Sequence, residues 1–497
     1  MALSIVHSRA KIGVDAPSVT IEVHLSNGLP GLTIVGMPET AVRESKDRVR
    51  SALLNSHFEF PARRITINLA PADLPKEGGR FDLAIALGIV AASEQVPAEQ
   101  PADTEVIGEL ALSGELRSID GVLPTALACA RAGKSLIAPI GNASEAALSK
   151  NTVVYGAQHL LEVCAHLNGK QPLVPSTTSI PGSIDVPAGD ISDIVGQHQA
   201  KRALEIAAAG GHNLLFKGPP GTGKTMLASR LPSILPPLSA DELLEVAAIH
   251  SVAGLGLRSA LSQPPFRSPH HTASATALVG GGSVPRPGEI SLAHHGVLFL
   301  DELPEFPRKV LEVLRESLES GEIMISRVQA KTRYPARFQL VAAMNPCPCG
   351  YQGSERCRCT PDQMRRYREK ISGPLLDRVG LQVDVPALPS KELMQGNPES
   401  ERSDVVRQRV TLARDKQRQQ NNVLNSQLSS QQLQRYCPLQ ADQKQLLQRA
   451  SERMDLSARA IHRVLKVART IADLESSETI EVTHLSEALS YRYKFSH

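Results

Sequence analysis

Apolar and polar positions divide the chain into three stretches with different patterns. Residues 1–165 alternate short strands rich in valine and isoleucine with helical segments. Residues 191–390 contain unbroken apolar runs that end in polar residues, which is typical of buried parallel strands. Beyond residue 391 the pattern is helical and polar. The segment 171–190 carries four prolines and two glycines and is predicted to be a linker.

A chain of 497 residues is long enough for three domains with separate cores. The pattern predicts an α+β domain over residues 1–170, an α/β domain over 191–390 and a helical lid over 391–497. Within the lid, residues 417–434 are rich in Gln and Asn, and we expect either a solvated helix or a connector there.

The apolar run at 213–216 is followed by a glycine-rich loop and then by a helical pattern. The loop fits G-x-x-x-x-G-K-[ST] in full, with residues Gly218, Pro219, Pro220, Gly221, Thr222, Gly223, Lys224 and Thr225. Backbone N–H groups of such a loop surround a β-phosphate at a helix N-terminus. Lys224 is predicted to reach the β- and γ-phosphates, and Thr225 to hold Mg²⁺. A Gly/Pro-rich turn that matches by chance is the alternative, and the flanking strand and helix argue against it.

A second apolar run, at 296–300, ends in Asp301 and Glu302. In open α/β sheets the ligand binds at the carboxyl ends of the strands. We expect Asp301 to hold Mg²⁺ and Glu302 to orient and polarise the attacking water. Alone, the run is equally consistent with a buried strand ending in surface acids. Together with the glycine-rich loop it predicts hydrolysis of a nucleoside triphosphate, with ATP as the expected substrate.

Asp301 follows Lys224 by 77 positions, more than a strand–helix–strand unit needs. The excess includes segments rich in proline, glycine and histidine between residues 264 and 288, which predict a projecting loop. For His270 and His271, local packing and hydrogen bonding is a commoner role than metal binding.

Three later positions resemble functional elements of AAA+ ATPases. The run at 339–344 ends in Asn345, which resembles the sensor-1 residue that orients the lytic water. Arg378 resembles an arginine finger, which would stabilise transition-state charge on a neighbour's γ-phosphate. Arg459 follows Ser457, a candidate helix N-cap, and resembles sensor 2, which implies that it faces the nucleotide. A surface salt bridge is the alternative role for either arginine.

Residues 194–207, the loop at 218–225 and residues 286–294 are similar to the magnesium-chelatase-like branch of AAA+ proteins. Within that branch the whole chain resembles the ComM/YifB family of bacterial competence-associated proteins. The resemblance implies a homo-hexameric DNA motor that uses ATP and Mg²⁺ to promote branch migration during natural transformation. It implies DNA as a partner without sequence preference, and recombination proteins as further candidate partners.

The N-terminal segment resembles the Lon-protease-like (S5) fold without its chemistry. Where that family carries D-G-P-S-A-G, residues 77–82 place Arg80 at the position of the nucleophilic serine. Leu123 stands where the activating lysine is expected. Without a nucleophile and a base no acyl-enzyme can form, so we expect a scaffold for assembly or for DNA.

Residues 323–337 predict two short strands around a basic tip, placed like the pre-sensor-1 hairpin that lines the pore of DNA-translocating relatives. The implied phosphate contacts are Arg327, Lys331, Arg333 and Arg337. From Ser326 to Arg378 there are eleven Lys and Arg against four Asp and Glu, whereas the whole chain carries only +3. Phosphate contacts of this kind carry no sequence code. A solvated basic face is the alternative.

Four of the seven cysteines lie within 13 residues, at Cys347, Cys349, Cys357 and Cys359. Such a cluster in a cytosolic chain indicates structural tetrahedral zinc, although the C-x-C spacing departs from the usual C-x₂-C. Free thiols or a transient disulfide are the alternatives.

The composition argues against several other classes of protein. No apolar run has the length of a membrane span, and the first ten residues lack the features of a signal peptide, so we expect a cytoplasmic protein without a membrane partner. Tryptophan is absent, and few aromatics argue against binding by base stacking.

Three functions compete: a DNA motor, a chelatase-like chaperone that remodels a protein partner, and an ATP-dependent protease. Arg80 and Leu123 disfavour the protease. The cysteine cluster, the basic segment and the fused N-terminal domain favour DNA over the chaperone. The sequence leaves open whether the ring would take single- or double-stranded DNA, the direction of movement and the recruiting partners.

Overall fold

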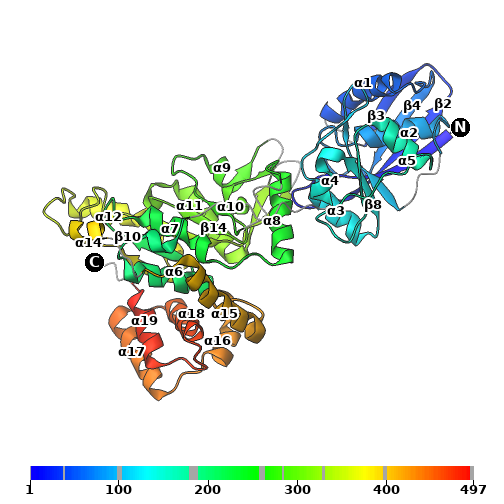
Figure 1. Ribbon diagram of the computed structural model, residues 1–497. Helices are drawn as coiled ribbons and strands as arrows, with labels where there is room; N and C mark the ends of the chain where they lie inside the picture. The colour runs from blue at the N-terminus through cyan, green and yellow to red at the C-terminus, as the bar shows by residue number, and fades with distance from the viewer. Residues whose placement is uncertain are drawn as a thin grey trace.

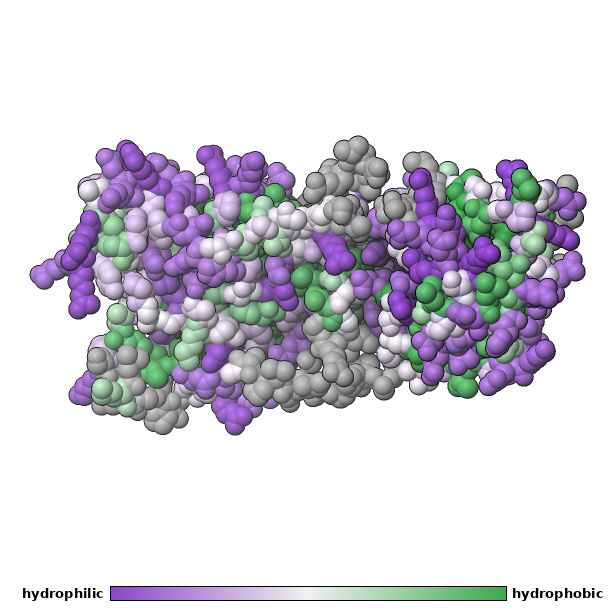
Figure 2. Space-filling model, turned by 90° about the horizontal axis from the view of Figure 1, so that it is seen from above, coloured by the Kyte–Doolittle hydropathy of each residue, from purple (hydrophilic) through white to green (hydrophobic). Residues whose placement is uncertain are grey.

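The computed structural model describes residues 2–36, 40–97, 103–177, 189–256, 263–282, 285–326, 331–395 and 400–492. The chain forms an N-terminal domain, a central module and a C-terminal group of helices, coloured from blue to red in Figure 1. Hydrophilic side chains cover most of the surface seen in Figure 2. None of the described helices is long and apolar enough to cross a membrane.

The described part of the N-terminal domain contains a mixed sheet of order β1-β2-β4-β3, a parallel sheet of order β5-β8-β9 and an antiparallel pair, β6-β7. Helix α2 is apolar on every side and buried along its whole length, so it forms the centre of this domain's core. The strands are β1 (Ala2–Arg9), β2 (Ser18–Ser26), β3 (Gly31–Val35), β4 (Arg64–Ala70), β5 (Thr104–Val106), β6 (Glu109–Leu110), β7 (Leu116–Arg117), β8 (Ser135–Pro139) and β9 (Val154–Ala157). The helices are α1 (Thr40–Asn55), α2 (Asp82–Ala92), α3 (Val122–Arg131), α4 (Ile140–Ala146) and α5 (Leu160–Leu167).

A five-stranded parallel sheet of order β11-β14-β17-β10-β18 forms the base of the central module. Its strands are β10 (Leu214–Lys217), β11 (Phe266–Arg267), β14 (Val297–Leu300), β17 (Gln339–Met344) and β18 (Leu381–Asp384). Every residue of β10, β14 and β17 is buried, because helices cover both faces of the sheet. The predicted AAA+ α/β module is therefore confirmed.

The remaining elements of the module connect or cover these strands. They are the helices α6 (His198–Gly210), α7 (Lys224–Ile234), α8 (Ala240–Val252), α9 (Ala275–Val279), α10 (Glu289–Leu292), α11 (Arg308–Ser320), α12 (Pro361–Glu369), α13 (Gly373–Leu376) and α14 (Ser390–Gln395), the ribbon β12 (Gly280–Gly281) with β13 (Arg286–Pro287), and the hairpin β15 (Glu322–Ser326) with β16 (Lys331–Pro335). The prediction of a projecting loop at 264–288 was wrong in part. Strand β11 joins the sheet there, and Leu278 of α9 is fully buried in the module's core.

The C-terminal helices pack on the central module through α15 and α18, which both contact α6. They are α15 (Ser403–Asn421), α16 (Ser430–Tyr436), α17 (Ala441–Met454), α18 (Ala458–Leu474) and α19 (Val482–Ser490), which confirms a helical lid. The expectation of a solvated helix or connector at 417–434 was wrong in part, because several of these residues are buried. Gln417 and Asn425 are fully buried. The backbone N–H of Asn425 donates to Gln417 Oε1 at 2.9 Å, and the side-chain amide of Asn425 donates to Asp473 Oδ2 at 2.7 Å.

Candidate nucleotide site

Three neighbouring strands end at the same edge of the sheet and bring the predicted nucleotide residues together. The glycine-rich loop follows β10, Asp301 and Glu302 follow β14, and Asn345 follows β17. Gly221 and Gly223 have φ of +77° and +84°, which only glycine adopts without strain, and α7 begins directly after Gly223. The loop therefore exposes the first N–H groups of α7 to an anion.

Lys224 is held at the centre of this edge by oxygen atoms. Its Nζ donates to the carbonyls of Gly218 at 2.8 Å and Pro219 at 2.7 Å, and to Asn345 Oδ1 at 3.2 Å. Burial lowers the pKa of Lys224, and the charges of Asp301 and Glu302 oppose that effect. The cation can exchange these neutral carbonyls for phosphate oxygens, so the arrangement fits a nucleotide.

The two residues predicted to bind Mg²⁺ are in direct contact. Thr225 Oγ1 donates to Asp301 Oδ2 at 2.6 Å, and the other oxygen of Asp301 accepts from the N–H of Glu302 at 2.9 Å. A hydroxyl and a carboxylate are hard oxygen ligands, which Mg²⁺ prefers when it also binds substrate phosphates. These residues fit the metal that the family implies.

Glu302 is paired with a histidine that the sequence did not single out for this role. Its Oε2 lies 3.1 Å from His271 Nδ1, and its backbone has φ of +52°, a conformation that is strained in a residue with a side chain. The pair agrees with local hydrogen bonding, rather than metal binding, as the role of His271. The pairing of two side chains 31 positions apart carries no local sequence signal.

The four clustered cysteines lie beside the glycine-rich loop. Sγ of Cys347 lies 3.4 Å from Sγ of Cys349 and 3.9 Å from Sγ of Cys357, and the Cys349–Cys357 distance is 3.8 Å. Four sulfurs bound to one zinc at about 2.3 Å would lie about 3.8 Å apart, so the four thiols fit zinc. Gly350 packs on the loop so closely that a Cβ atom there would lie 2.6 Å from Pro220 Cδ.

A second cluster of potential metal ligands, Glu245 with His294 and His295, does not fit a metal. His294 Nδ1 accepts the N–H of Arg337 at 3.0 Å, so the neutral ring carries its proton on Nε2. That Nε2 donates to Glu245 Oε2 at 2.9 Å. Burial lowers the pKa of His294 to about 4, which keeps the ring neutral and its proton engaged.

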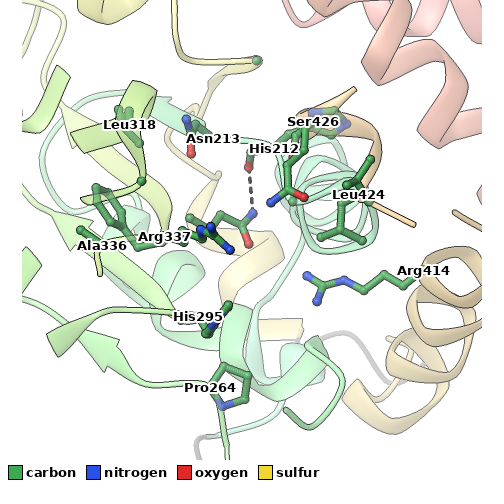
Figure 3. A pocket seen from close by; sticks show the side chains of 18 of the residues that line it. His212, Asn213, Pro264, His295, Leu318, Ala336, Arg337, Arg414, Leu424 and Ser426 are labelled. Atoms are coloured by element: carbon green, nitrogen blue, oxygen red, sulfur yellow. Dashed lines mark hydrogen bonds between the residues drawn. The ribbon is translucent and has the colours of Figure 1, made fainter. Parts of the chain in front are cut away.

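The opposite edge of the sheet borders a basic cavity of about 830 Å³ between the central module and the lid (Figure 3). Its walls include the residues that precede β10, β11, β14, β17 and β18, so it lies at the amino ends of the strands. Two carboxylates, Glu242 and Glu319, face seven cations. The cations are Arg337, Arg378, Arg414, Arg418, Arg459, Arg463 and Lys466.

Arg378 and Arg459 lie at this basic cavity and not beside the glycine-rich loop. Strands β10, β14 and β17 have four to six residues, so the two edges are roughly 13–20 Å apart at about 3.3 Å per residue. The expectation that Arg459 faces the nucleotide is therefore wrong for the loop of its own chain. Arg378 was expected to act on a neighbour, and its position is compatible with that role.

Charge is unbalanced around these arginines. Arg378 pairs with Glu319, and burial together with Arg315 and Arg459 lowers the pKa of Arg378. Arg463 lies 3.9 Å from Asp377, and its Nη1 makes no hydrogen bond. Burial, reinforced by Arg492, lowers the pKa of Arg463 to about 10. In Figure 3, Arg337 and Arg414 extend into the basic cavity from the central module and from the lid.

The predicted basic hairpin is present. Strands β15 and β16 pair antiparallel, with Ser326 opposite Lys331 and Met324 opposite Arg333. Lys331 and Arg333 are exposed on one face of β16. Arg337 is separated from them, because it lies beyond the hairpin and lines the basic cavity. Arg327 lies outside the described residues.

Arg80 and Leu123 of the N-terminal domain both lie at buried positions, where they pack against other parts of the chain. Arg80 is buried, and its Nη2 lies 3.4 Å from the carbonyl of Asp120 and 3.5 Å from that of Gly121. Leu123 packs with Leu148 against Val246 and Ala247 of α8, where the two domains meet. Neither residue offers a nucleophile or a base.

Three family models match the chain. "Magnesium chelatase, subunit ChlI" covers residues 190–393, "Subunit ChlI of Mg-chelatase" covers 21–142, and "Magnesium chelatase, subunit ChlI C-terminal" covers 400–492. The "Magnesium-chelatase 38 kDa subunit" of Rhodobacter capsulatus is 28% identical over 42% of this chain and 59% of its own length.

Two full-length relatives are more similar. "Uncharacterized protein YifB" of Salmonella typhimurium is 54% identical, over 99% of this chain and 97% of the relative. "Competence protein ComM" of Haemophilus influenzae is 53% identical, over 99% and 98% of the two chains. The chain therefore belongs to the ComM/YifB family of magnesium-chelatase-like AAA+ proteins.

Proposed function

We propose that the chain is an ATPase that works as a homo-hexameric ring and drives movement along branched DNA. The observation that carries the proposal is the division of the catalytic groups between two opposite edges of one sheet. Lys224, Asp301 and Glu302 lie at the carboxyl edge, and Arg378 and Arg459 lie at the amino edge. Copies that stack head to tail around a ring would bring one edge of each chain against the other edge of its neighbour.

Each group at the carboxyl edge has a defined task. Bound Mg²⁺-ATP supplies the phosphoanhydride that is cleaved and the charge that the loop recognises. Lys224 turns from the carbonyls of Gly218 and Pro219 to phosphate oxygens. Thr225 and Asp301 would hold the metal, and Asn345, whose Oδ1 lies 3.2 Å from Lys224 Nζ, would position the water. Glu302 polarises that water once its carboxylate leaves His271.

The arginines at the amino edge would complete the site of the next chain. Arg378 and Arg459 would meet the γ-phosphate, where guanidinium groups stabilise the charge of the transition state. The excess of cations in the basic cavity supports this role, because an incoming polyphosphate would balance the charge. A ring would then hydrolyse ATP only where two copies meet.

DNA as the substrate is supported by the hairpin and by one relative. Lys331 and Arg333 project together from β16, which in the sequence lies between α11 and β17, the strand that Asn345 follows. The name of the Haemophilus influenzae relative connects that protein with competence, which favours DNA processing in this chain as well. Translocation along one arm of a junction drags the crossover with it, so such a motor would promote branch migration.

The partial similarity to a magnesium-chelatase subunit favours a second candidate, a chaperone that remodels a protein partner. ATPase rates measured without DNA and with linear, forked and four-way DNA separate the two. Stimulation by DNA, and ATP-dependent movement of a four-way junction, are expected for the motor. A wild-type protein that neither binds DNA at moderate salt nor processes a branched substrate would support the chaperone instead.

A further inference from the structure

The turn between β1 and β2 of the N-terminal domain reaches into the central module. It is closed by paired backbone hydrogen bonds, Ile12 N–H to Asp15 O at 3.0 Å and Asp15 N–H to Ile12 O at 2.9 Å. Gly13 at its tip is buried and has φ of +59°, a conformation that favours glycine. Val14 packs against the core of the central module.

Gly13 is in tight contact with the hairpin. A Cβ atom on Gly13 would lie 2.5 Å from Thr332 Cγ2, 3.2 Å from the carbonyl oxygen of Arg333 and 3.5 Å from Tyr334 Cε1. Glycine is therefore required here for the close approach as well as for its backbone angle. The turn presses on the buried face of β16, and Lys331 and Arg333 occupy the exposed face of the same strand.

The hairpin depends on support from outside itself. Among the described residues β15 and β16 pair only with each other, and an isolated two-stranded ribbon is marginally stable in water. Its apolar face, with Ile323, Ile325 and Tyr334, belongs to the core cluster against which Val14 packs. The Tyr334 hydroxyl donates to the carbonyl of Pro285 at 2.7 Å. The turn is therefore one of the contacts from outside the hairpin that hold it in place.

A second attachment fixes the domain from which the turn projects. Helix α3 packs against α8, as their adjacent positions in Figure 1 show. Two N–H groups at the start of α3 are held by Ser251 of α8. The N–H of Gly121 donates to its carbonyl at 3.0 Å, and the N–H of Leu123 donates to its hydroxyl at 3.3 Å. With the domain anchored there, the turn is braced against the hairpin.

We propose that residues 11–15 of the N-terminal domain are a brace that sets the position of the β15–β16 hairpin, so that this domain controls how Lys331 and Arg333 are presented to a polyanion. Gly13 and Val14 are positioning residues in this account and touch no substrate. The brace itself rests on contacts alone. Its consequence for DNA rests on the proposed function.

The test uses the full chain and a compensating pair of substitutions. Gly13→Ala would drive its Cβ into Thr332 Cγ2, and Thr332→Ser removes that methyl group while keeping the hydroxyl. Gly133→Ala is the matched control, because Gly133 has φ of +66° and a Cβ there would meet nothing within 4 Å. The readouts are hydrogen exchange of the amides in β15 and β16, and the rate of trypsin cleavage after Lys331 and Arg333.

Gly13→Ala should accelerate exchange and cleavage in the hairpin about 5- to 30-fold, because overpacking of this kind shifts the population of a locally opened segment by that factor. Gly13→Ala with Thr332→Ser should recover part of the wild-type protection, because it relieves the methyl clash but not the backbone strain at residue 13. Gly133→Ala should have no effect on the hairpin. Unchanged hairpin exchange in Gly13→Ala, or an equal change in Gly133→Ala, would overturn the brace.

If Gly13→Ala fails to fold, Val14→Ala gives the same test with a smaller expected change, because it removes packing without adding a clash. Basal ATP hydrolysis should stay at the wild-type rate in every folded variant, and stimulation by DNA should fall in Gly13→Ala and recover in the double variant. A loosened hairpin in a protein whose wild type shows no stimulation by DNA would count against the proposed function and leave the brace standing.

Discussion

The two edges of the central sheet differ in how their charges are satisfied. At the carboxyl edge Lys224 has three oxygen partners, and Asp301 has two donors. At the amino edge seven cations share a cavity with two carboxylates, and Arg463 keeps an N–H group without a hydrogen bond. The first edge is arranged to hold its residues ready without ligand. The second holds more cations than carboxylates, which is the difference expected if each edge supplies half of a site shared with a neighbouring copy, as proposed above.

The largest expected effect is on ATP hydrolysis, in variants that are altered at one edge of the sheet and are then mixed with variants altered at the other edge. Lys224→Ala and Arg378→Ala should each lower ATP hydrolysis by about 10³-fold or more, because each removes a group that is proposed to contact the transferred phosphoryl. Mixed in equal amounts, they should recover activity at about a quarter of the interfaces, where an intact loop meets an intact arginine. ATPase rates over a range of mixing ratios measure this.

The matched control is a mixture of Lys224→Ala with Glu302→Gln. Both residues lie at the carboxyl edge, so no neighbour can supply the missing group and the mixture should stay inactive. Glu302→Gln alone should still bind ATP. Recovery in this control, or no recovery with Arg378→Ala, would contradict the assignment of the two edges to adjacent chains.

The next largest effect concerns the zinc content of the cysteine cluster, which lies at the carboxyl edge. Elemental analysis of reduced protein should give about one zinc per chain, and replacement of both Cys357 and Cys359 by serine should remove it. Because Gly350 packs on Pro220, loss of the metal should also weaken ATP binding severalfold. Cys437→Ser, outside the cluster, should retain zinc. Metal-free wild-type protein with normal stability would exclude a zinc site.

A smaller effect is expected from acid at the amino edge. Burial, with Lys466 adding to it, lowers the pKa of His212 to about 3, and its Nε2 lies 2.8 Å from Thr470 Oγ1 of the lid. Since the unfolded chain takes up the proton near pH 6.5 and the folded chain does not, stability should fall as the pH drops below 6.5. At pH 5 the loss is about 2 kcal/mol relative to pH 7.

Chemical denaturation at pH 7 and pH 5 measures this loss. His212→Gln should flatten the dependence on pH, whereas replacement of the exposed His462 should leave it unchanged. An equal dependence in His212→Gln and in wild type would show that acid acts elsewhere in the molecule.

The smallest effect is on the salt dependence of DNA binding, which should change in variants of the hairpin but not in a variant at the amino edge. Lys331→Ala and Arg333→Ala should each lower the slope of log affinity for DNA against log salt by about 0.7–0.9, the contribution of one phosphate contact. Arg337→Ala should leave this slope unchanged, because Arg337 lines the basic cavity. Binding titrations at several salt concentrations give the slopes. An equal decrease in Arg337→Ala would extend the DNA path to the amino edge.

The carboxyl edge was predictable from the sequence because its signals are local. Apolar runs predict buried parallel strands, and the polar residues that follow such strands meet at one edge. Lys224, Thr225, Asp301 and Asn345 are therefore brought together as the sequence analysis expected. Their catalytic roles stay predictions until the variants are measured.

The amino edge was not predictable, because it is assembled by packing between distant segments. His212 meets Thr470 across 258 positions, and this junction of module and lid determines which edge Arg459 lies on. A motif places Arg459 at the start of a helix but carries no information on where that helix docks. The burial of Asn425 has the same origin, because its side-chain amide donates to Thr470 and Asp473, which lie far away in the sequence.

The contact between the N-terminal turn and the hairpin has a consequence for dissecting this protein by truncation. The predicted linker at 171–190 invites removal of everything before it, to prepare the ATPase part alone. Such a fragment would lose Val14 from its core and uncover Val246 and Ala247, which Leu123 and Leu148 now cover. Freshly exposed apolar surface promotes self-association. The behaviour of the shortened protein would therefore reflect this newly exposed surface as well as the ATPase part, so point substitutions in the intact chain are the better test.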